Sequence, residues 1–256
     1  MKDKNGLLLG AVLGVIGMMG QSAAAAEIKV LTTGAFKQVV VALVPEFEKA
    51  TGHKVIVDNG TVGQLTQRVE GGEAFDVLVL SPRGIEDFIK KGKIVAGTNA
   101  NLAKVGVGVM VKAGAPKPNI DSVEAFKQAL LKAKSVAYID PASGGSSGIY
   151  VSGLLDKLGI ADQIKPKAKL KKGGHVSDLI ESGEAELGIH QMSEIVSQKG
   201  VTLVGPLPSA IQNYTTYAVG LGSGAASNAD AAKAFIKVLT GPSAASVLKS
   251  TGMEGA

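Results

Sequence analysis

The feature that most limits the folds open to this chain is a repeated order of apolar run, polar turn and helix-spaced apolar residues. It occurs three times after residue 27, with predicted strands at 28–31, 53–57 and 75–80. Continuous apolar strands that alternate with helices are typical of a parallel sheet covered on both faces. We therefore predict an α/β fold.

The turns that follow these strands carry hydroxyl groups or a cation. Thr32 and Thr33 follow the first strand, Thr61 follows the second, and Ser81 and Arg83 follow the third. In an open parallel sheet such turns lie along the carboxyl edge of the strands, where ligands bind. We expect a ligand site at this edge.

A fourth turn, within residues 135–150, has the sequence SVAYIDPASGGSSGIY. A predicted strand ends at Asp140-Pro141, and a glycine-rich turn leads into a predicted helix. The free N–H groups of a helix start, together with Ser146 and Ser147, favour an anion. The alternative is that the glycines only let the backbone turn and the serines cap the helix.

Two segments indicate crossings between two lobes. The proline-containing stretch 113–120 follows an apolar strand at 105–111, and a Gly-Pro-Leu-Pro kink lies at 205–208. We place hinges near 111–118 and 204–208. The predicted lobes are residues 27–111 with 206–256, and residues 112–205. Each is expected to be a mixed sheet flanked by helices, with the ligand cleft between them.

Residues 1–26 are predicted to be a signal peptide. Lys2 and Lys4 precede an apolar run at 7–19, and Ala24–Ala26 forms an A-x-A cleavage site. The apolar run is short for a membrane span, although an uncleaved anchor remains an alternative. We expect a periplasmic protein. The absence of cysteine excludes disulfides, a lipid anchor at cysteine and thiolate metal sites.

The amino-acid composition limits the classes of ligand and partner that we expect for this chain. The formal net charge is +5, and removing Lys2, Asp3 and Lys4 leaves the chain basic, which suits a small anion. Only 4% of residues are aromatic and tryptophan is absent, so we expect no nucleic acid partner. The glycines form neither G-x-G-x-x-G nor a P-loop. We expect a monomer with no cofactor and no metal.

Several longer motifs resemble one known family. They are PEFEKATG at 45–52, DVLVLSP at 76–82, IDP with GIY between 139 and 150, GEAELGI at 183–189, and GME at 252–254. Over essentially the whole length after residue 26, the chain resembles type II periplasmic solute-binding proteins, most closely the molybdate-binding proteins of ABC uptake systems. The resemblance implies a two-lobed fold, a small anionic ligand and a membrane permease as partner.

The chain departs from that family at the turns that hold the oxyanion. Ala35 stands where the resemblance leads us to expect a serine, the second turn reads NGTVG at 59–63, and His190 replaces a tyrosine. Arg83 and Lys37 supply positive charge that could clamp a carboxylate, unless both are solvated surface charges. We therefore predict uptake of a di- or tricarboxylate such as aconitate, with molybdate or tungstate as an alternative.

A second alternative is an enzyme. A periplasmic aconitate isomerase is similar to the molybdate-binding proteins, and moving its double bond needs one positioned base. His190 is the candidate base, although a neutral hydrogen-bonding role fits it as well. The predicted site residues are Thr32, Thr33, Gly34, Thr61, Ser81, Arg83, Ser146, Ser147, His190 and Gln191.

Overall fold

The computed structural model describes residues 25–256. The first 24 residues of the predicted signal peptide lie outside the described residues. The strands are β1 (Glu27–Thr33), β2 (Lys54–Gly60), β3 (Val77–Leu80), β4 (Ala100–Lys112), β5 (Val136–Ile139), β6 (Ala168–Lys171), β7 (Leu187–Gln191), β8 (Val201–Pro206), β9 (Tyr214–Leu221) and β10 (Glu254–Gly255).

The helices alternate with these strands as the sequence pattern predicts. They are α1 (Gly34–Thr51), α2 (Val62–Glu70), α3 (Pro82–Lys90), α4 (Val123–Lys132), α5 (Ser146–Lys157), α6 (Ala161–Ile164), α7 (Ser177–Glu181), α8 (Met192–Val196), α9 (Ala229–Leu239) and α10 (Pro242–Ser250). Short 3₁₀ turns lie at Pro141–Ser143, Lys165–Lys167 and Ser209–Ile211.

One mixed ten-stranded sheet runs through the described chain, in the order β2-β1-β3-β9-β4-β7-β5-β6, with β8 and β10 also paired to β4. β1 pairs in parallel with β2 and β3, and β5 pairs in parallel with β6 and β7. The strands β9 and β4 join these two parallel groups by antiparallel pairing. This confirms the predicted α/β fold with mixed sheets.

The long strand β4 belongs to both halves of the sheet. Its residues 100–106 pair with β9, whereas residues 107–112 pair with β7 and β8. The chain therefore crosses at Gly106–Val107, and not at the predicted 111–118. The apolar run 105–111 passes through the crossing without interruption, so hydropathy does not mark it. The chain returns between β8 and β9, through residues 207–213.

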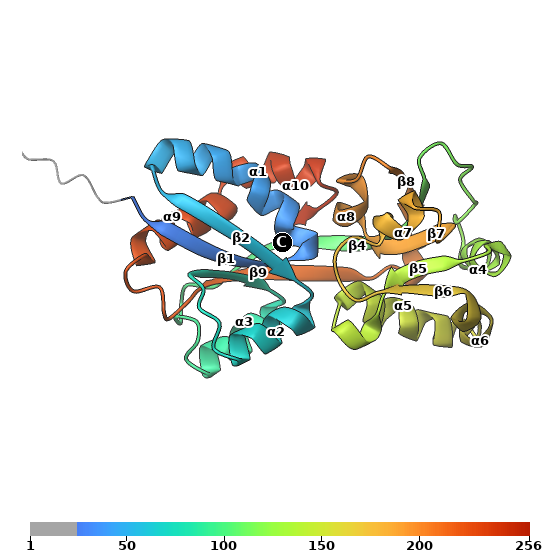
Figure 1. Ribbon diagram of the computed structural model, residues 1–256, viewed down its shortest axis with the longest axis horizontal. Helices are drawn as coiled ribbons and strands as arrows, with labels where there is room; N and C mark the ends of the chain where they lie inside the picture. Colours follow the sequence, from blue (N-terminus) through green and yellow to red (C-terminus); the bar gives the residue numbers. More distant parts are fainter. Residues whose placement is uncertain (1–24) are drawn as a thin grey trace, which may run out of the picture.

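We call the part around β1, β2, β3 and β9 the first lobe and the part around β5, β6, β7 and β8 the second lobe. The sequence-based boundary assigned residues 107–111 to the first lobe, whereas strand pairing joins them to the second. In the first lobe, α1, α9 and α10 cover one face and α2 and α3 the other (Figure 1). In the second lobe, α4, α5 and α6 share one core and α7 and α8 another. Each lobe is thus a three-layer structure.

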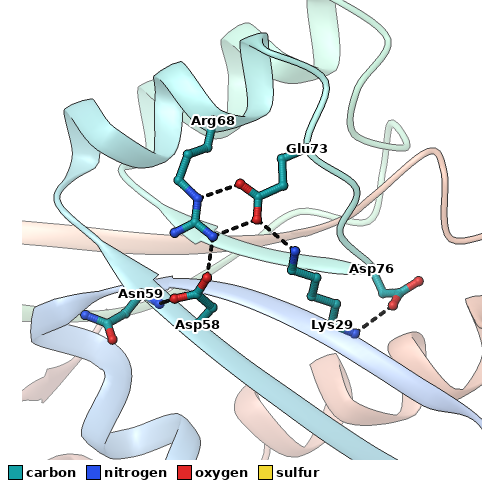
Figure 2. Close-up of polar contacts among 6 residues, drawn as sticks. All are labelled: Lys29, Asp58, Asn59, Arg68, Glu73 and Asp76. Carbon is teal, nitrogen blue, oxygen red and sulfur yellow. Dashed lines mark hydrogen bonds and ion pairs between the residues drawn. The ribbon is translucent and has the colours of Figure 1, made fainter.

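A charged network joins β1, β2 and α2 in the first lobe (Figure 2). Arg68 on α2 contacts Glu73 through Nε and an Nη nitrogen, each at 2.6 Å, and also pairs with Asp58 at the end of β2. Lys29 on β1 reaches Glu73 at 2.8 Å. Arg68 and Lys29 lower the pKa of Glu73 to about 2. The network fixes the carboxyl end of α2 against the sheet.

Replacing Arg68 with methionine should destabilise the protein by about 1–3 kcal/mol, because Asp58 loses its charged partner and Glu73 keeps only Lys29. Arg68 is only 27% exposed, which makes its ion pairs stronger than those at the surface. Urea unfolding measures the effect, with Arg83→Met as the control. Arg83 is 92% exposed and its ion pair with Asp87 is long, at 4.0 Å, so this variant should stay within about 0.5 kcal/mol of wild type. Equal losses in the two variants would contradict the account.

Candidate functional site

A cavity of about 40 Å³ lies between the lobes, at the carboxyl ends of β1, β2, β5 and β7. Its place agrees with the rule for open α/β sheets. It is lined by Thr33, Gly34, Ala35, Asn59, Gly60, Thr61, Val62, Ile139, Gly145, Ser146, Ser147, Gly174, His190, Gln191, Glu194 and Tyr217.

Three helix starts meet at this cavity. α1 begins after Thr33 and α5 begins after Gly145, and neither start has a side-chain cap. α2 begins after Thr61, whose hydroxyl accepts a hydrogen bond from the Gln64 N–H group. Helix starts present N–H groups and the positive end of the helix dipole. The convergence of α1 and α5 favours a negatively charged group in the cavity.

Two polar side chains of the lining have buried atoms without a hydrogen-bond partner in the described chain. They are the Thr33 hydroxyl and the side-chain oxygen of Gln191. The Gln191 amide nitrogen is held by the Thr215 hydroxyl at 2.8 Å. An unpaired buried polar atom costs about 1–3 kcal/mol, so these atoms are ready to bond a ligand.

The most unusual feature of the cavity is a buried histidine–glutamate pair. His190 is the second-to-last residue of β7 and Glu194 lies in α8. The turn between strand and helix brings His190 Nδ1 to 3.2 Å from a Glu194 carboxyl oxygen. Both side chains are less than a tenth exposed. His190 Nε2 makes no hydrogen bond to any described residue, which leaves this nitrogen available for a ligand.

Burial keeps both members of the pair in their neutral forms. It lowers the pKa of His190 to about 3, with a further decrease from the nearby His175. Burial also raises the pKa of Glu194 to about 8, against the opposing charge of Lys37. At pH 7 the imidazole is therefore uncharged and the carboxyl holds a proton. A cavity without a carboxylate charge accepts an anion, and a carboxyl group with a proton can donate a hydrogen bond to it.

Tyr217 on β9 completes the cavity from the first lobe. Burial raises its pKa, and the neighbouring Glu194 raises it further, so the phenol keeps its proton. It supplies a hydroxyl without adding negative charge. Tyr217 is not among the predicted site residues, because it lies in the middle of an ordinary strand pattern.

The structure brings seven of the predicted site residues together around the cavity: Thr33, Gly34, Thr61, Ser146, Ser147, His190 and Gln191. Three others lie elsewhere. The Thr32 hydroxyl is buried and contacts the Thr33 carbonyl at 3.3 Å. Ser81 caps α3 through the Gly84 N–H at 3.3 Å. The exposed Arg83 points to solvent beside Asp87.

These three positions correct the prediction from strand and turn order. A turn at the correct edge fixes where the backbone goes but leaves the side-chain direction open. Arg83 is in the first turn of α3, on its solvent side. Lys37 does not line the cavity either, and it acts on the site only through its charge.

Glu194, Asn59 and Tyr217 are the polar lining residues that the predicted site omitted. The signal for Glu194 was the spacing of four residues after His190 across a strand-to-helix turn. Among residues 25–256, no group of three or more His, Cys, Asp or Glu side chains could hold a metal ion. In the same range, no helix combines the length and apolar character needed to cross a bilayer.

Comparison with known proteins identifies the family to which the chain belongs. Residues 28–254 match the family model described as bacterial extracellular solute-binding protein. The chain belongs to this family. It is 30% identical over 254 residues to an aconitate isomerase from Pseudomonas sp, a match that covers 97% of this chain and 95% of the relative. It is also 30% identical to the molybdate-binding protein ModA of Azotobacter vinelandii, over 92% of this chain and 93% of that protein.

Solved structures of solute-binding proteins share the fold. The periplasmic molybdate-binding protein of Azotobacter vinelandii superposes with a TM-score of 0.74 at 20% identity, covering 89% of this chain and 98% of that one. The sulfate-binding protein SubI of Mycobacterium tuberculosis gives 0.71 at 18% identity, covering 90% and 87%. The predicted resemblance to molybdate-binding proteins and the type II fold are confirmed. The chain is a ModA-like solute-binding protein.

Proposed function

We propose that this solute-binding protein works in the periplasm, binds a small polycarboxylate in the cavity between its lobes, and interconverts cis- and trans-aconitate by proton transfer. The neutral His190–Glu194 pair, buried in a cavity rich in N–H and O–H donors, is the observation that carries the proposal. The full-length similarity to an aconitate isomerase supports the same chemistry.

The carboxylate groups of the substrate would be held by both lobes. The starts of α1 and α5 offer backbone N–H groups, and Thr33, Ser146 and Ser147 offer hydroxyls. Each hydrogen bond to a charged acceptor contributes about 1.5–3 kcal/mol to binding. The full set of these donors is assembled only when both lobes contact the substrate. Substrate binding would thus favour the closed cleft.

Proton transfer would proceed through the imidazole of His190. Its Nδ1 faces Glu194, so Nε2 is the nitrogen that accepts a proton from the substrate methylene. The electrons of the broken C–H bond form the new double bond. Those of the old double bond move to its far carbon, and the charge spreads onto the attached carboxylate. Return of the proton to that far carbon completes the isomerisation, with no other reactant.

The bound substrate would prepare the base for this step. A pKa of about 3 makes His190 a weak base in the unliganded cavity. The negative charges of a polycarboxylate raise the pKa of a neighbouring imidazole, because they stabilise its protonated form. Donors aimed at the substrate carboxylates stabilise the charge that develops during the step.

A second candidate is a receptor for a compact oxyanion such as molybdate, working with an ABC permease. The volume of about 40 Å³ favours it, because this space suits a tetrahedral anion better than a tricarboxylate unless the cleft opens further. The similarity to ModA proteins supports it as well. The same uptake role would apply to a carboxylate that is bound without conversion.

Two measurements separate these functions. Calorimetric titration of the protein lacking residues 1–26 with trans-aconitate, citrate, molybdate and sulfate identifies the ligand class. An ultraviolet absorbance assay detects cis/trans interconversion. We expect binding and turnover of aconitate, with weak molybdate binding. Tight molybdate binding without aconitate binding would replace the proposal with the second candidate, and aconitate binding without turnover would leave an uptake receptor.

A further inference from the structure

The start of α2 in the first lobe is bonded directly to two loops of the second lobe. The Gly63 N–H donates to the Gly144 carbonyl at 3.1 Å, and the Gln64 amide nitrogen donates to the Lys172 carbonyl at 3.0 Å. The Thr61 hydroxyl donates to the Ser143 carbonyl. We call these six residues the clasp. It lies beside the cavity, since Thr61 belongs to both.

Glycine at two of these positions allows the backbones to touch. A Cβ atom on Gly63 would lie 2.8 Å from the Gly144 Cα, and one on Gly144 would lie 2.6 Å from the Gly63 Cα. Such distances are too short for real Cβ contacts, so any side chain here would push the lobes apart. Gly63 has an ordinary helical backbone, whereas Gly144 has a φ of +71°. The requirement for glycine at position 63 thus comes from the contact between lobes.

Gln64 links the helix start to the clasp. Its side-chain oxygen accepts a hydrogen bond from the Thr61 N–H at 2.9 Å, which forms a capping box with the Thr61 hydroxyl. Its amide nitrogen reaches the second lobe. One side chain therefore orders α2 and bonds across the cleft.

We propose that the clasp closes the cleft without help from a ligand, and that Gly63 sets how far the lobes approach and so limits ligand affinity and size. All three bonds run from one protein group to another, so closure needs no ligand atom. A closed state that is already populated binds more tightly, because the apparent dissociation constant is the intrinsic value divided by the closed fraction. Three net hydrogen bonds would change that fraction about tenfold or more.

The experiment measures the distance between lobes in the ligand-free protein, and therefore does not depend on the proposed function. The chain has no cysteine, so Arg83→Cys and Asp162→Cys can carry spin labels at chosen sites. These side chains are 92% and 97% exposed. They lie on α3 and α6, which belong to different lobes (Figure 1). Pulsed electron–electron double resonance then gives the distribution of distances between the two labels.

Gly63→Ala is the test variant and Gly153→Ala the matched control. Both replace a helical glycine with alanine and so favour the helix, but a Cβ atom on Gly153 meets nothing within 4 Å. We expect one closed distance in the wild type and in Gly153→Ala, and a shift to longer distances in Gly63→Ala. Circular dichroism confirms that both fold. Equal distributions in all three proteins, or an equal shift in the control, would overturn the proposal.

Gln64→Glu tests the bond across the cleft separately. Glutamate keeps the capping box but loses the donor to the Lys172 carbonyl. We expect a partial shift to the open distance, with α2 intact by hydrogen exchange. For any compact oxyanion that calorimetry detects, the dissociation constant should rise about tenfold in Gly63→Ala. A wild-type distribution in Gln64→Glu, or an unchanged constant in Gly63→Ala, would contradict the clasp.

Discussion

Replacing His190 with glutamine should lower the rate of aconitate interconversion by about 10²–10⁴-fold, while binding of aconitate changes only several-fold. Glutamine keeps a hydrogen-bonding group near Glu194 but cannot accept the proton of a C–H bond. General base catalysis by a positioned side chain contributes a factor of this size. Absorbance kinetics measure the rate, and calorimetry measures binding in the same preparation.

His53→Gln is the control for this experiment. His53 immediately precedes β2 and does not line the cavity. Its replacement should leave turnover unchanged. Turnover above a tenth of the wild-type rate in His190→Gln would remove the imidazole from the mechanism, and loss of binding together with turnover would make its role structural.

The second large effect concerns Glu194 and pH. Affinity for any anion should fall as pH rises above about 8, approaching tenfold per pH unit, because the carboxyl then becomes a negative charge in the cavity. Glu194→Gln should remove this dependence, since glutamine stays neutral. Calorimetric titration between pH 6 and 10 measures it. The same decline in both proteins would contradict a titrating Glu194.

The same group affects stability with a defined sign. The pKa of Glu194 is raised from 4.5 to about 8 in the folded protein, so the unfolded chain loses its proton first. Folding stability from this group therefore falls as pH rises from about 4.5 to about 8, at up to about 1.4 kcal/mol per pH unit. Glu194→Gln should be more stable than wild type at pH 8 and show no such gain at pH 4. A difference that is constant with pH would contradict burial of the acid.

His190 contributes to stability in the opposite direction. Its pKa is lowered in the folded protein, so its contribution is lost as pH falls from about 6.5 towards 3. Because His190 is present in both proteins of the Glu194→Gln comparison, its effect cancels to first order. The difference between the two unfolding curves therefore reports Glu194.

The fold followed from the sequence because its signals are local. The buried strands β3 and β5 are continuous apolar runs, and the starts of α1 to α5 and of α10 are marked by Thr, Ser or Gly. The first crossing was misplaced for the opposite reason. β4 serves both lobes as one uninterrupted strand, so only strand pairing reveals that its partners change after Gly106.

The cavity was partly predictable because turns at one sheet edge must converge. Ser146, Ser147 and Thr61 were identified in this way. The prediction for Arg83 was wrong. The direction of its side chain depends on how α3 is rotated about its own axis, and the spacing of residues along the sequence did not reveal this rotation. The importance of Glu194 depends on burial and on contact with His190, which are properties of the folded cavity. The clasp joins residues between about 80 and 108 positions apart and left no local signal.

The most direct test of the central proposal is exchange of substrate hydrogen with solvent. Aconitate is incubated with the protein in D₂O and followed by proton NMR. We predict that the wild-type protein replaces methylene hydrogen by deuterium as the isomers interconvert, and that His190→Gln does neither. Aconitate that binds to the wild-type protein but neither interconverts nor exchanges hydrogen would contradict proton transfer in this cavity, whereas interconversion without exchange would mean that His190 returns the same proton.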